Sequence, residues 1–233
     1  MPNHDAIYRE EAAQYHEMIA RQPSLLPVVK ELVSIRGLDI VDMGAGTGRL
    51  SAVLAPEAGS LVALDAAEAM LSITAERLRE AGLSNWSVQT ADHRELPLPD
   101  DSADLVVSGW SVCYLASSDV PDWERNLERI MGEIRRVLRP GGTVILFETM
   151  GTGRETPTPP EFLLPYYREL TERYGFSHRS IRVDYEFDNA DQAERLTRFF
   201  FGDELGDRVA AGKLARVPEC AGVWWRKLGT GLK

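Results

Sequence analysis

The chain has 233 residues, of which 44% are hydrophobic and 27% charged, proportions that are ordinary for a globular protein with one large core or two small ones. Its formal net charge of −10 opposes binding to phosphate backbones and anionic membrane surfaces, and the sequence contains no basic run or apolar stretch of bilayer length. Nucleic-acid substrates and membrane partners are therefore not expected.

Cysteines and histidines are few. Cys113 and Cys220 cannot form a disulfide framework, and the first residues lack the basic and apolar segments of an export signal. We therefore expect a cytoplasmic protein. The four histidines are scattered and no Cys/His cluster occurs, so a metal site is not expected.

The N-terminal part of the chain has the composition of helices. Residues 6–21 are rich in Ala and Glu and are expected to form one helix. Residues 26–35 are expected to form a second helix, which leads to the first strand and ends at Gly37.

Glycines dominate the next stretch. Residues 38–41 form a short apolar run that ends at Asp42, and glycine then occupies every second position, at Gly44, Gly46 and Gly48. Apolar residues at helical spacing follow in residues 50–54, so the pattern predicts a strand, a tight turn and a helix. Glycine accepts positive φ and lets a ligand approach the backbone. A plain strand-to-helix connection is the alternative interpretation.

A second apolar run, residues 61–64, ends in Asp65, about 20 residues beyond the first glycine. At this spacing an acidic residue on the second strand reaches the hydroxyls of a ribose, and a carboxylate can accept from two vicinal hydroxyls at once. The spacing does not distinguish a dinucleotide from another adenosine ligand.

Strands and helices alternate through the rest of the chain. Helices are expected over residues 66–82, 123–138, 161–174 and 190–201, and strands over residues 86–90, 103–109, 143–149, 179–187 and 220–227. Residues 103–109 are apolar almost throughout, as in a strand that is buried on both faces. Such alternation is typical of α/β proteins.

The ordered set of motifs resembles that of the class I S-adenosylmethionine (SAM)-dependent methyltransferases. The resemblance lies within residues 38–150 and rests on Asp42 before the G-x-G-x-G turn, on Asp65, and on residues 91–92, 104–109 and 139–142. It implies a single domain over residues 1–233, with a Rossmann-like, seven-stranded, mostly parallel sheet, helices on both faces and an antiparallel last strand. Residues 1–36 would form a helical cap, and residues 150–178 a loop and helix over the acceptor site.

The resemblance also implies SAM as cofactor and S-adenosylhomocysteine as product. Residues implied to surround the cofactor are Tyr15, Asp42, Met43, Gly44, Ala45, Gly46, Gly48, Asp65, Ala66, Met70, Asp92, His93, Ser108 and Trp110. Asp92 would bond the adenine amino group and Met70 would contact the adenine face, while Tyr15 would belong to a lid. Core packing of Met70 and Tyr15, and a solvated loop position for Asp92, are the alternatives.

The methyl acceptor's site has no fixed sequence signature. Aromatic residues expected to line it are Trp110, Tyr114, Phe162, Tyr166 and Tyr167, because they follow the fourth and fifth strands, whose carboxyl ends border the ligand cleft in such sheets. Core packing of the same rings is the alternative. Candidates for a general base are His93, Tyr114, Glu148 and His178, and none has a compelling sequence context.

The expected activity is methyl transfer by in-line SN2 displacement to a small, partly aromatic or apolar acceptor. An NAD(P)-dependent oxidoreductase is one alternative, because it would use the same turn and Asp65, although it leaves Asp92 and residues 139–142 without a role. A catalytically silent SAM-binding or interaction module is another. The acceptor's identity, the methylated atom, the need for a base and the oligomeric state follow from no motif.

Overall fold

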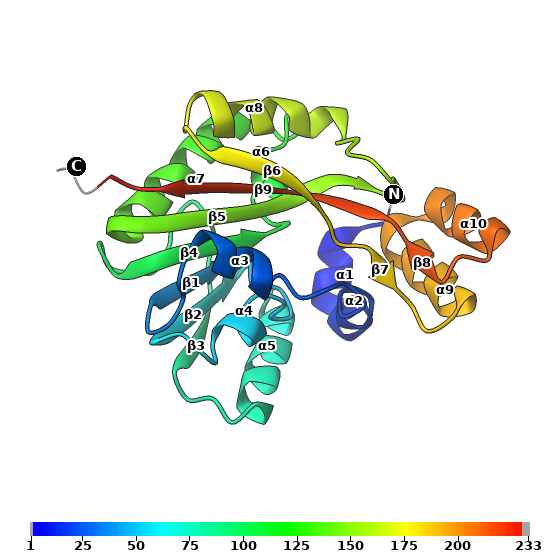
Figure 1. The fold of residues 1–233 in the computed structure, drawn as a ribbon, viewed down its shortest axis with the longest axis horizontal. Coiled ribbons are helices and arrows are strands. Elements are labelled where there is room, and N and C mark those ends of the chain that lie inside the picture. Colours follow the sequence, from blue (N-terminus) through cyan, green and yellow to red (C-terminus); the bar gives the residue numbers. More distant parts are fainter. Residues whose placement is uncertain (1, 230–233) are drawn as a thin grey trace.

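The structure is a computed structural model that describes residues 2–229. Its main sheet contains β1 (Asp39–Met43), β2 (Ser60–Asp65), β3 (Trp86–Thr90), β4 (Ala103–Gly109), β5 (Leu138–Thr152), β6 (Ser177–Arg182) and β9 (Glu219–Lys227). These seven strands lie in the order β3-β2-β1-β4-β5-β9-β6 (Figure 1). Pairing is parallel from β3 to β5, and β9 runs antiparallel to both of its neighbours. The expected fold class is confirmed.

Helices cover both faces of this sheet. They are α3 (Leu26–Leu32), α4 (Ser51–Leu54), α5 (Glu68–Glu80), α6 (Cys113–Ala116), α7 (Trp123–Val137) and α8 (Leu164–Glu172), the last preceded by the 3₁₀ turn η1 (Glu161–Leu163). α3, α4 and α5 pack on one face, α7 and α8 on the other. In α7, Leu127, Ile130 and Ile134 recur at helical spacing, and this buried stripe fastens the helix to the sheet.

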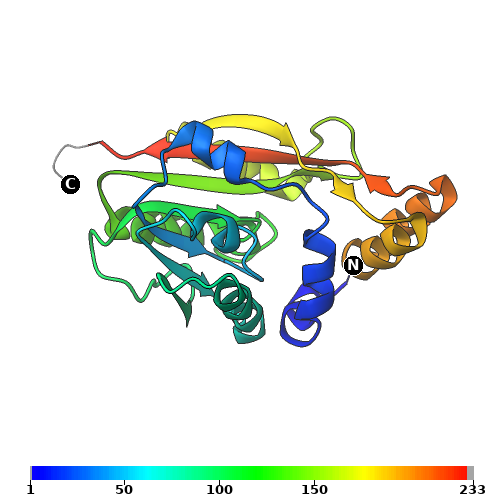
Figure 2. The same ribbon diagram turned by 60° about the horizontal axis from the view of Figure 1, so that its bottom comes forward.

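A separate group of elements lies beyond the carboxyl ends of the parallel strands. It consists of α1 (His4–Glu10), α2 (Ala12–Ile19), β7 (Tyr185–Glu186), α9 (Ala190–Phe201), α10 (Asp203–Gly212) and β8 (Arg216–Val217). Figures 1 and 2 show these N-terminal and C-terminal segments beside one another at one end of the sheet. They share a small core of their own, to which Ile7, Met18, Leu196 and Val209 contribute.

Three expected helices differ from the structure. The helix expected over residues 6–21 breaks at Glu11, whose φ of −128° and ψ of 28° lie outside the helical region, and the break lets both α1 and α2 bury apolar side chains in the same core. The helix over residues 26–35 ends earlier, because Val33 is extended. The helix after the glycine turn is a single turn, since Pro56 prevents its continuation.

The strands differ at two places, and two helices, α6 and α10, were not expected. Residues 139–142 form the start of β5 with a register shift against β4, not a separate turn, and Arg139 forms ion pairs with Asp39 and Asp104. The strand expected over residues 179–187 splits at Asp184, whose carboxylate accepts a hydrogen bond from the Glu219 amide. α10 was missed because a second helix follows α9 after only Gly202.

Among residues 2–229, no helix has both the length and the apolar character needed to cross a membrane.

Candidate functional site

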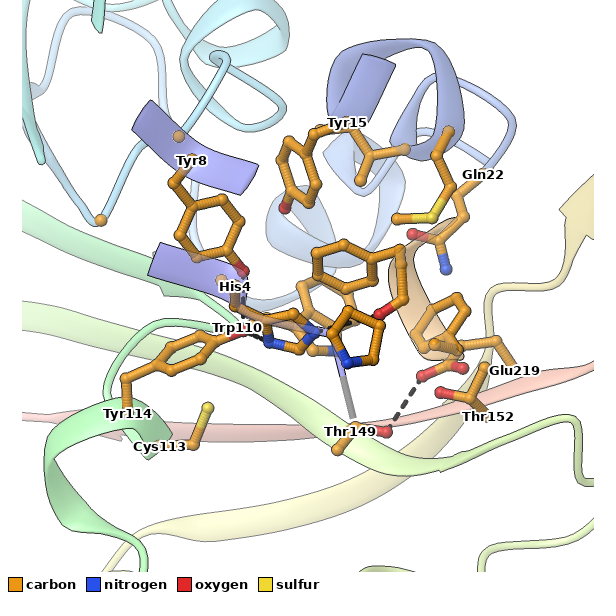
Figure 3. Close-up of a pocket in the computed structure, with 18 of the residues that line it drawn as sticks. His4, Tyr8, Tyr15, Gln22, Trp110, Cys113, Tyr114, Thr149, Thr152 and Glu219 are labelled. Atoms are coloured by element: carbon orange, nitrogen blue, oxygen red, sulfur yellow. Dashed lines mark hydrogen bonds between the residues drawn. The ribbon is translucent and has the colours of Figure 1, made fainter. Parts of the chain in front are cut away.

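A cavity of about 600 Å³ opens at the carboxyl ends of β1, β4 and β5. Residues 42, 44–47, 49–50 and 109–110 line one end, and side chains of α1, α2, α9 and α10 line the other (Figure 3). The carboxyl ends of parallel strands are where open α/β sheets bind ligands. The separate N- and C-terminal core therefore serves as the far wall of this cavity.

The glycine turn forms the near wall. Gly44 and Gly46 have φ of +77° and +55°, a region that glycine adopts without strain. A Cβ on Gly44 would lie 1.8 Å from Ser111 Oγ, whereas a Cβ on Gly46 would meet only Met70 Cε at 3.6 Å. Close packing thus requires glycine at position 44, while the absence of a side chain at position 46 leaves the wall bare for a ligand.

Asp65 holds this turn against β2. Its Oδ2 accepts a hydrogen bond from the Gly46 amide at 2.8 Å, and its Oδ1 accepts one from the Ala67 amide at 2.9 Å. Burial raises the pKa of Asp65, and these backbone hydrogen bonds partly offset that effect. Each carboxylate oxygen retains further acceptor capacity, so the residue can still receive hydroxyl donors.

Asp42 lies at the base of the cavity and is almost fully buried. Its Oδ2 accepts from Ser51 Oγ at 2.6 Å, and its Oδ1 has no hydrogen-bond partner among the described residues. Burial raises the pKa of Asp42 to about 7, although the Ser51 hydrogen bond lowers it. The position therefore offers a buried acceptor to a ligand that carries an N–H or O–H group.

Arg49 and Trp110 form a cation–π pair in the cavity wall. Trp110 has a φ of +50°, and the Arg49 guanidinium lies 4.3 Å from its ring centroid. Arg49 Nη2 is buried and has no hydrogen-bond partner within the described chain. We did not expect Arg49 from the sequence, where its position directly after the last glycine was the available signal.

An aromatic cluster of His4, Tyr8, Tyr15, Tyr114 and Phe200 closes the far end (Figure 3). His4 Nε2 lies 3.0 Å from the Phe200 carbonyl oxygen, which can only accept, so Nε2 carries the proton. In the neutral ring, Nδ1 then accepts from the Tyr114 hydroxyl at 3.0 Å, and Tyr114 accepts from the Tyr8 hydroxyl at 2.6 Å. These bonds fasten α1 to both α6 and α9.

Glu219, the first residue of β9, brings a carboxylate to the same cavity. Its Oε1 accepts from Thr149 Oγ1 at 3.1 Å, and its Oε2 has no partner among the residues described (Figure 3). Burial raises the pKa of Glu219 to about 7, against the lowering effect of the Thr152 and Thr149 hydroxyls. Glu219 was not expected from the sequence, where the available signal was a carboxylate before a mainly apolar strand.

The expected cofactor residues fall into two groups. Those that line the cavity are Tyr15, Asp42, Gly44, Ala45, Gly46 and Trp110. Those that do not line the cavity are Met43, Gly48, Asp65, Ala66, Met70, Asp92, His93 and Ser108. Asp92 forms an ion pair with Arg94 at 2.6 Å, and the hydrogen bond from Arg94 lowers the pKa of Asp92 to about 2. A cofactor contact stays a prediction for every residue of both groups.

The expected acceptor residues are only partly at the cavity. Trp110, Tyr114 and Phe162 line it. Tyr166 and Tyr167 are buried between α8 and the sheet, outside the cavity lining, and their contact with an acceptor stays a prediction. α8 lies on a face of the sheet rather than over its end, and of residues 150–178 only the end of β5, the loop and η1 reach the cavity.

Three of the four candidate bases also lie outside the cavity lining. His93 is buried beside Ser111, at 2.5 Å between Nε2 and Oγ, and burial lowers its pKa to about 4. Glu148 is buried and accepts from the Cys113 amide at 3.1 Å. The ring of His178 on β6 stacks on Trp224 at 4.2 Å. These placements leave Tyr114 as the expected base candidate that lines the cavity.

Comparisons with known proteins agree with this geometry. Residues 41–146 match the family model of a methyltransferase domain. Phosphoethanolamine N-methyltransferase 1 of Triticum aestivum is 29% identical over 152 residues, which are 63% of this chain and 28% of that protein. Demethylmenaquinone methyltransferase of Listeria welshimeri is 32% identical over 117 residues, 49% of this chain and 46% of that protein. The chain thus spans less than half the length of these two relatives.

A solved SAM-dependent methyltransferase from Aquifex aeolicus has the same fold, with a TM-score of 0.56 and 20% identity. The superposition covers 88% of this chain and 94% of that one. Residues 41–146 therefore resemble a methyltransferase domain in sequence, and the described chain has the Rossmann-like fold of the class I SAM-dependent methyltransferases.

Proposed function

We propose that this protein transfers a methyl group from SAM to a small-molecule acceptor. The observation that carries the proposal is that one continuous cavity joins the glycine turn to the aromatic cluster. Its volume lies in the range of small-molecule sites. The names of the two relatives specify methylation of phosphoethanolamine and of demethylmenaquinone, which are both small molecules.

The glycine-turn end fits the cofactor. The space beside Gly46 is open, and Asp65 keeps acceptor capacity next to the turn, as a ribose requires. Gly44, Gly46 and Asp65 would hold the adenosine part, and Trp110 would border the methionine part. When bound, SAM supplies a methyl carbon that its sulfonium makes electrophilic.

The protein contributes by holding the acceptor in position relative to the methyl group. An SN2 displacement needs the acceptor atom in line behind the methyl carbon, and holding two reactants in such a geometry removes much of the barrier. The aromatic cluster would confine the acceptor on the side of the cavity opposite the glycine turn. No covalent intermediate on the protein is required.

Calorimetric titration tests the cofactor. SAM and S-adenosylhomocysteine should bind and NADH should not, and tight NADH binding without SAM binding would replace the proposal by an oxidoreductase. Transfer of labelled methyl should then be measured on small phenols, amines, thiols and carboxylates beside bulk tRNA and protein. Transfer to the macromolecules alone would contradict a small-molecule acceptor.

We also propose that the protein works in the cytoplasm, where thiols stay reduced. Both cysteines are free: Cys113 is half-buried and Cys220 is buried. Subcellular fractionation with a specific antibody should find the protein in the cytoplasmic fraction, and recovery from an exported fraction would contradict this location.

A further inference from the structure

The Glu219 carboxylate is a polar group that the methyl-transfer scheme above does not use. It is 2% exposed, lines the cavity, and leaves Oε2 without a hydrogen-bond partner in the described part of the chain. Buried carboxylate oxygens are costly to leave unpaired. A ligand that offers a donor at this position would therefore be bound strongly.

Aromatic rings line the same cavity as Glu219. The ring centroids of Tyr8 and Tyr15 are 5.2 Å apart, and Tyr15 lies 5.2 Å from Phe200. Tyr114 lies 5.9 Å from Tyr8. The faces of such rings attract cations and repel anions, because they carry negative charge density.

The remaining charged groups near Glu219 do not neutralise it by contact. Arg49, from the glycine turn, and Asp184, beside β7, interact with Glu219 through longer-range electrostatics, and Arg49 stacks on the Trp110 ring with its Nη2 unpartnered among the described residues. Arg154 and Arg208 also line the cavity, and neither forms an ion pair with Glu219 in the described part of the chain. Asp184 is bonded to Arg182 and Arg216. The second oxygen of Glu219 thus stays available for a ligand.

We propose that the methyl acceptor is a primary or secondary amine on an apolar body, and that Glu219 binds its nitrogen and removes its proton. This inference rests on the proposed function and names its substrate class. An anionic acceptor such as a carboxylate would face both Glu219 and the negative ring faces. A neutral alcohol or thiol would gain no cation–π attraction from the rings.

The bound ammonium gives one proton to the Glu219 carboxylate and becomes a neutral amine. The lone pair of its nitrogen attacks the methyl carbon of the cofactor, the new C–N bond forms, and the S–C bond breaks with its electrons left on sulfur. The product is a methylated ammonium, stabilised by the rings, and the proton on Glu219 passes to solvent as the product leaves.

Acceptors that differ only in the reacting group test the substrate class. Benzylamine, N-methylbenzylamine and octylamine should accept labelled methyl, whereas benzyl alcohol, phenylmethanethiol and phenylacetate should not. Glu219→Gln should lower kcat/KM for the amines by about 10²- to 10⁴-fold, with SAM affinity unchanged. Glu186→Gln, which removes an exposed carboxylate on β7, is the matched control and should leave the rate unchanged.

A binding measurement gives a readout that is independent of turnover. Phenyltrimethylammonium should bind in the presence of S-adenosylhomocysteine, and Glu219→Gln should weaken it about tenfold or more, while its neutral isostere tert-butylbenzene should bind both proteins equally. Equal affinity of phenyltrimethylammonium for both proteins would overturn this inference but leave the proposed methyl-transfer function standing. Amine methylation that survives Glu219→Gln would have the same consequence. Transfer to the alcohol or thiol but to no amine does the same.

Two controls keep the outcomes distinct. Absence of SAM binding to the parent protein overturns the proposed function and the inference together. If Glu219→Gln does not fold, Thr149→Val removes the hydroxyl that holds Oε1 and should lower kcat/KM for amines several-fold without changing SAM affinity. An unchanged rate for amines in Thr149→Val would then count against the inference.

Discussion

The two ends of the cavity are built from different parts of the chain. At the near end, residues 42–50 supply a continuous piece of main chain whose glycines leave the surface bare. At the far end the wall consists of side chains from α1, α2, α6, α9 and β9, which are distant in sequence. The near end therefore depends on local backbone geometry, and the far end depends on how separate segments dock.

This difference explains which changes each end should tolerate. A turn with positive φ and close packing has few acceptable substitutions, because a Cβ strains the backbone as well as the contact. A wall of side chains held by individual hydrogen bonds can lose one bond at modest cost. Substitutions at the near end should therefore have larger effects than substitutions at the far end.

Gly44→Ala should produce the largest effect. Its Cβ would collide with Ser111 Oγ at 1.8 Å and would hold alanine at a φ of +77°. The strain and the overpacking together should lower the free energy of unfolding by about 2–5 kcal/mol. In urea denaturation, Gly46→Ala is the matched control and should cost only about 1–2 kcal/mol. Equal losses would show that close packing does not separate the two glycines.

His93, which supports the glycine turn through Ser111, should make stability depend on pH. Its pKa falls to about 4 in the folded protein, so below the unfolded value near 6.5 the unfolded chain binds the proton more readily. The contribution of neutral His93 to stability should therefore decline as the pH drops from about 6.5 to 4, by about 3 kcal/mol in total. Denaturation at several pH values should show this decline in the parent relative to His93→Gln, and parallel curves would contradict it.

Asp65→Asn should affect cofactor binding without disturbing the far end. Loss of charged hydrogen bonds to a ribose should weaken SAM binding by about 1–3 kcal/mol in calorimetry. Binding of phenyltrimethylammonium, which we assign to the far end, should stay unchanged. Glu68→Gln, an exposed change at the start of α5, is the control for charge alone. If Asp65→Asn bound SAM like the parent, the carboxylate would serve only to hold the turn.

The Tyr8–Tyr114 hydrogen bond should give the smallest effect. Tyr8→Phe and Tyr114→Phe each remove one hydroxyl of this pair, so a double-mutant cycle isolates the bond that links α1 to α6. Its coupling in thermal unfolding should be about 0.5–1.5 kcal/mol. A coupling near zero would mean that packing alone holds α1, whereas several kcal/mol would make the far wall as intolerant of change as the near one.

Local patterns were sufficient for most of the sheet and for the glycine turn. The strands β3 and β4 lie where their apolar runs predicted them, and helix α5 ends before Gly82, whose φ is +70°. These features depend on neighbours within a few residues: apolar runs, positive φ, and the proline that shortens α4. The residues within a few positions determine these features, because backbone conformation and strand or helix preference depend mainly on neighbouring residues.

The far wall could not be predicted in this way. Tyr167 and Phe200 are both aromatic residues on amphipathic helices, yet Tyr167 packs on Trp224 in the core while Phe200 lines the cavity. Nothing near either residue in sequence distinguishes the two, because the outcome depends on which surface each helix meets.

The sequence by itself determined the strands β1 to β4, the helix α5 between β2 and β3, the bare main chain of the glycine turn and the acidic residues at the strand ends. Only the tertiary structure decided that the C-terminal helices close the cavity and that Glu219 and Arg49 face it. The physical reason is the sequence separation of the interacting residues. Backbone conformation follows from neighbouring residues. Burial of a charge follows from contacts between α1, α9, β5 and β9, which come together only when the chain has folded.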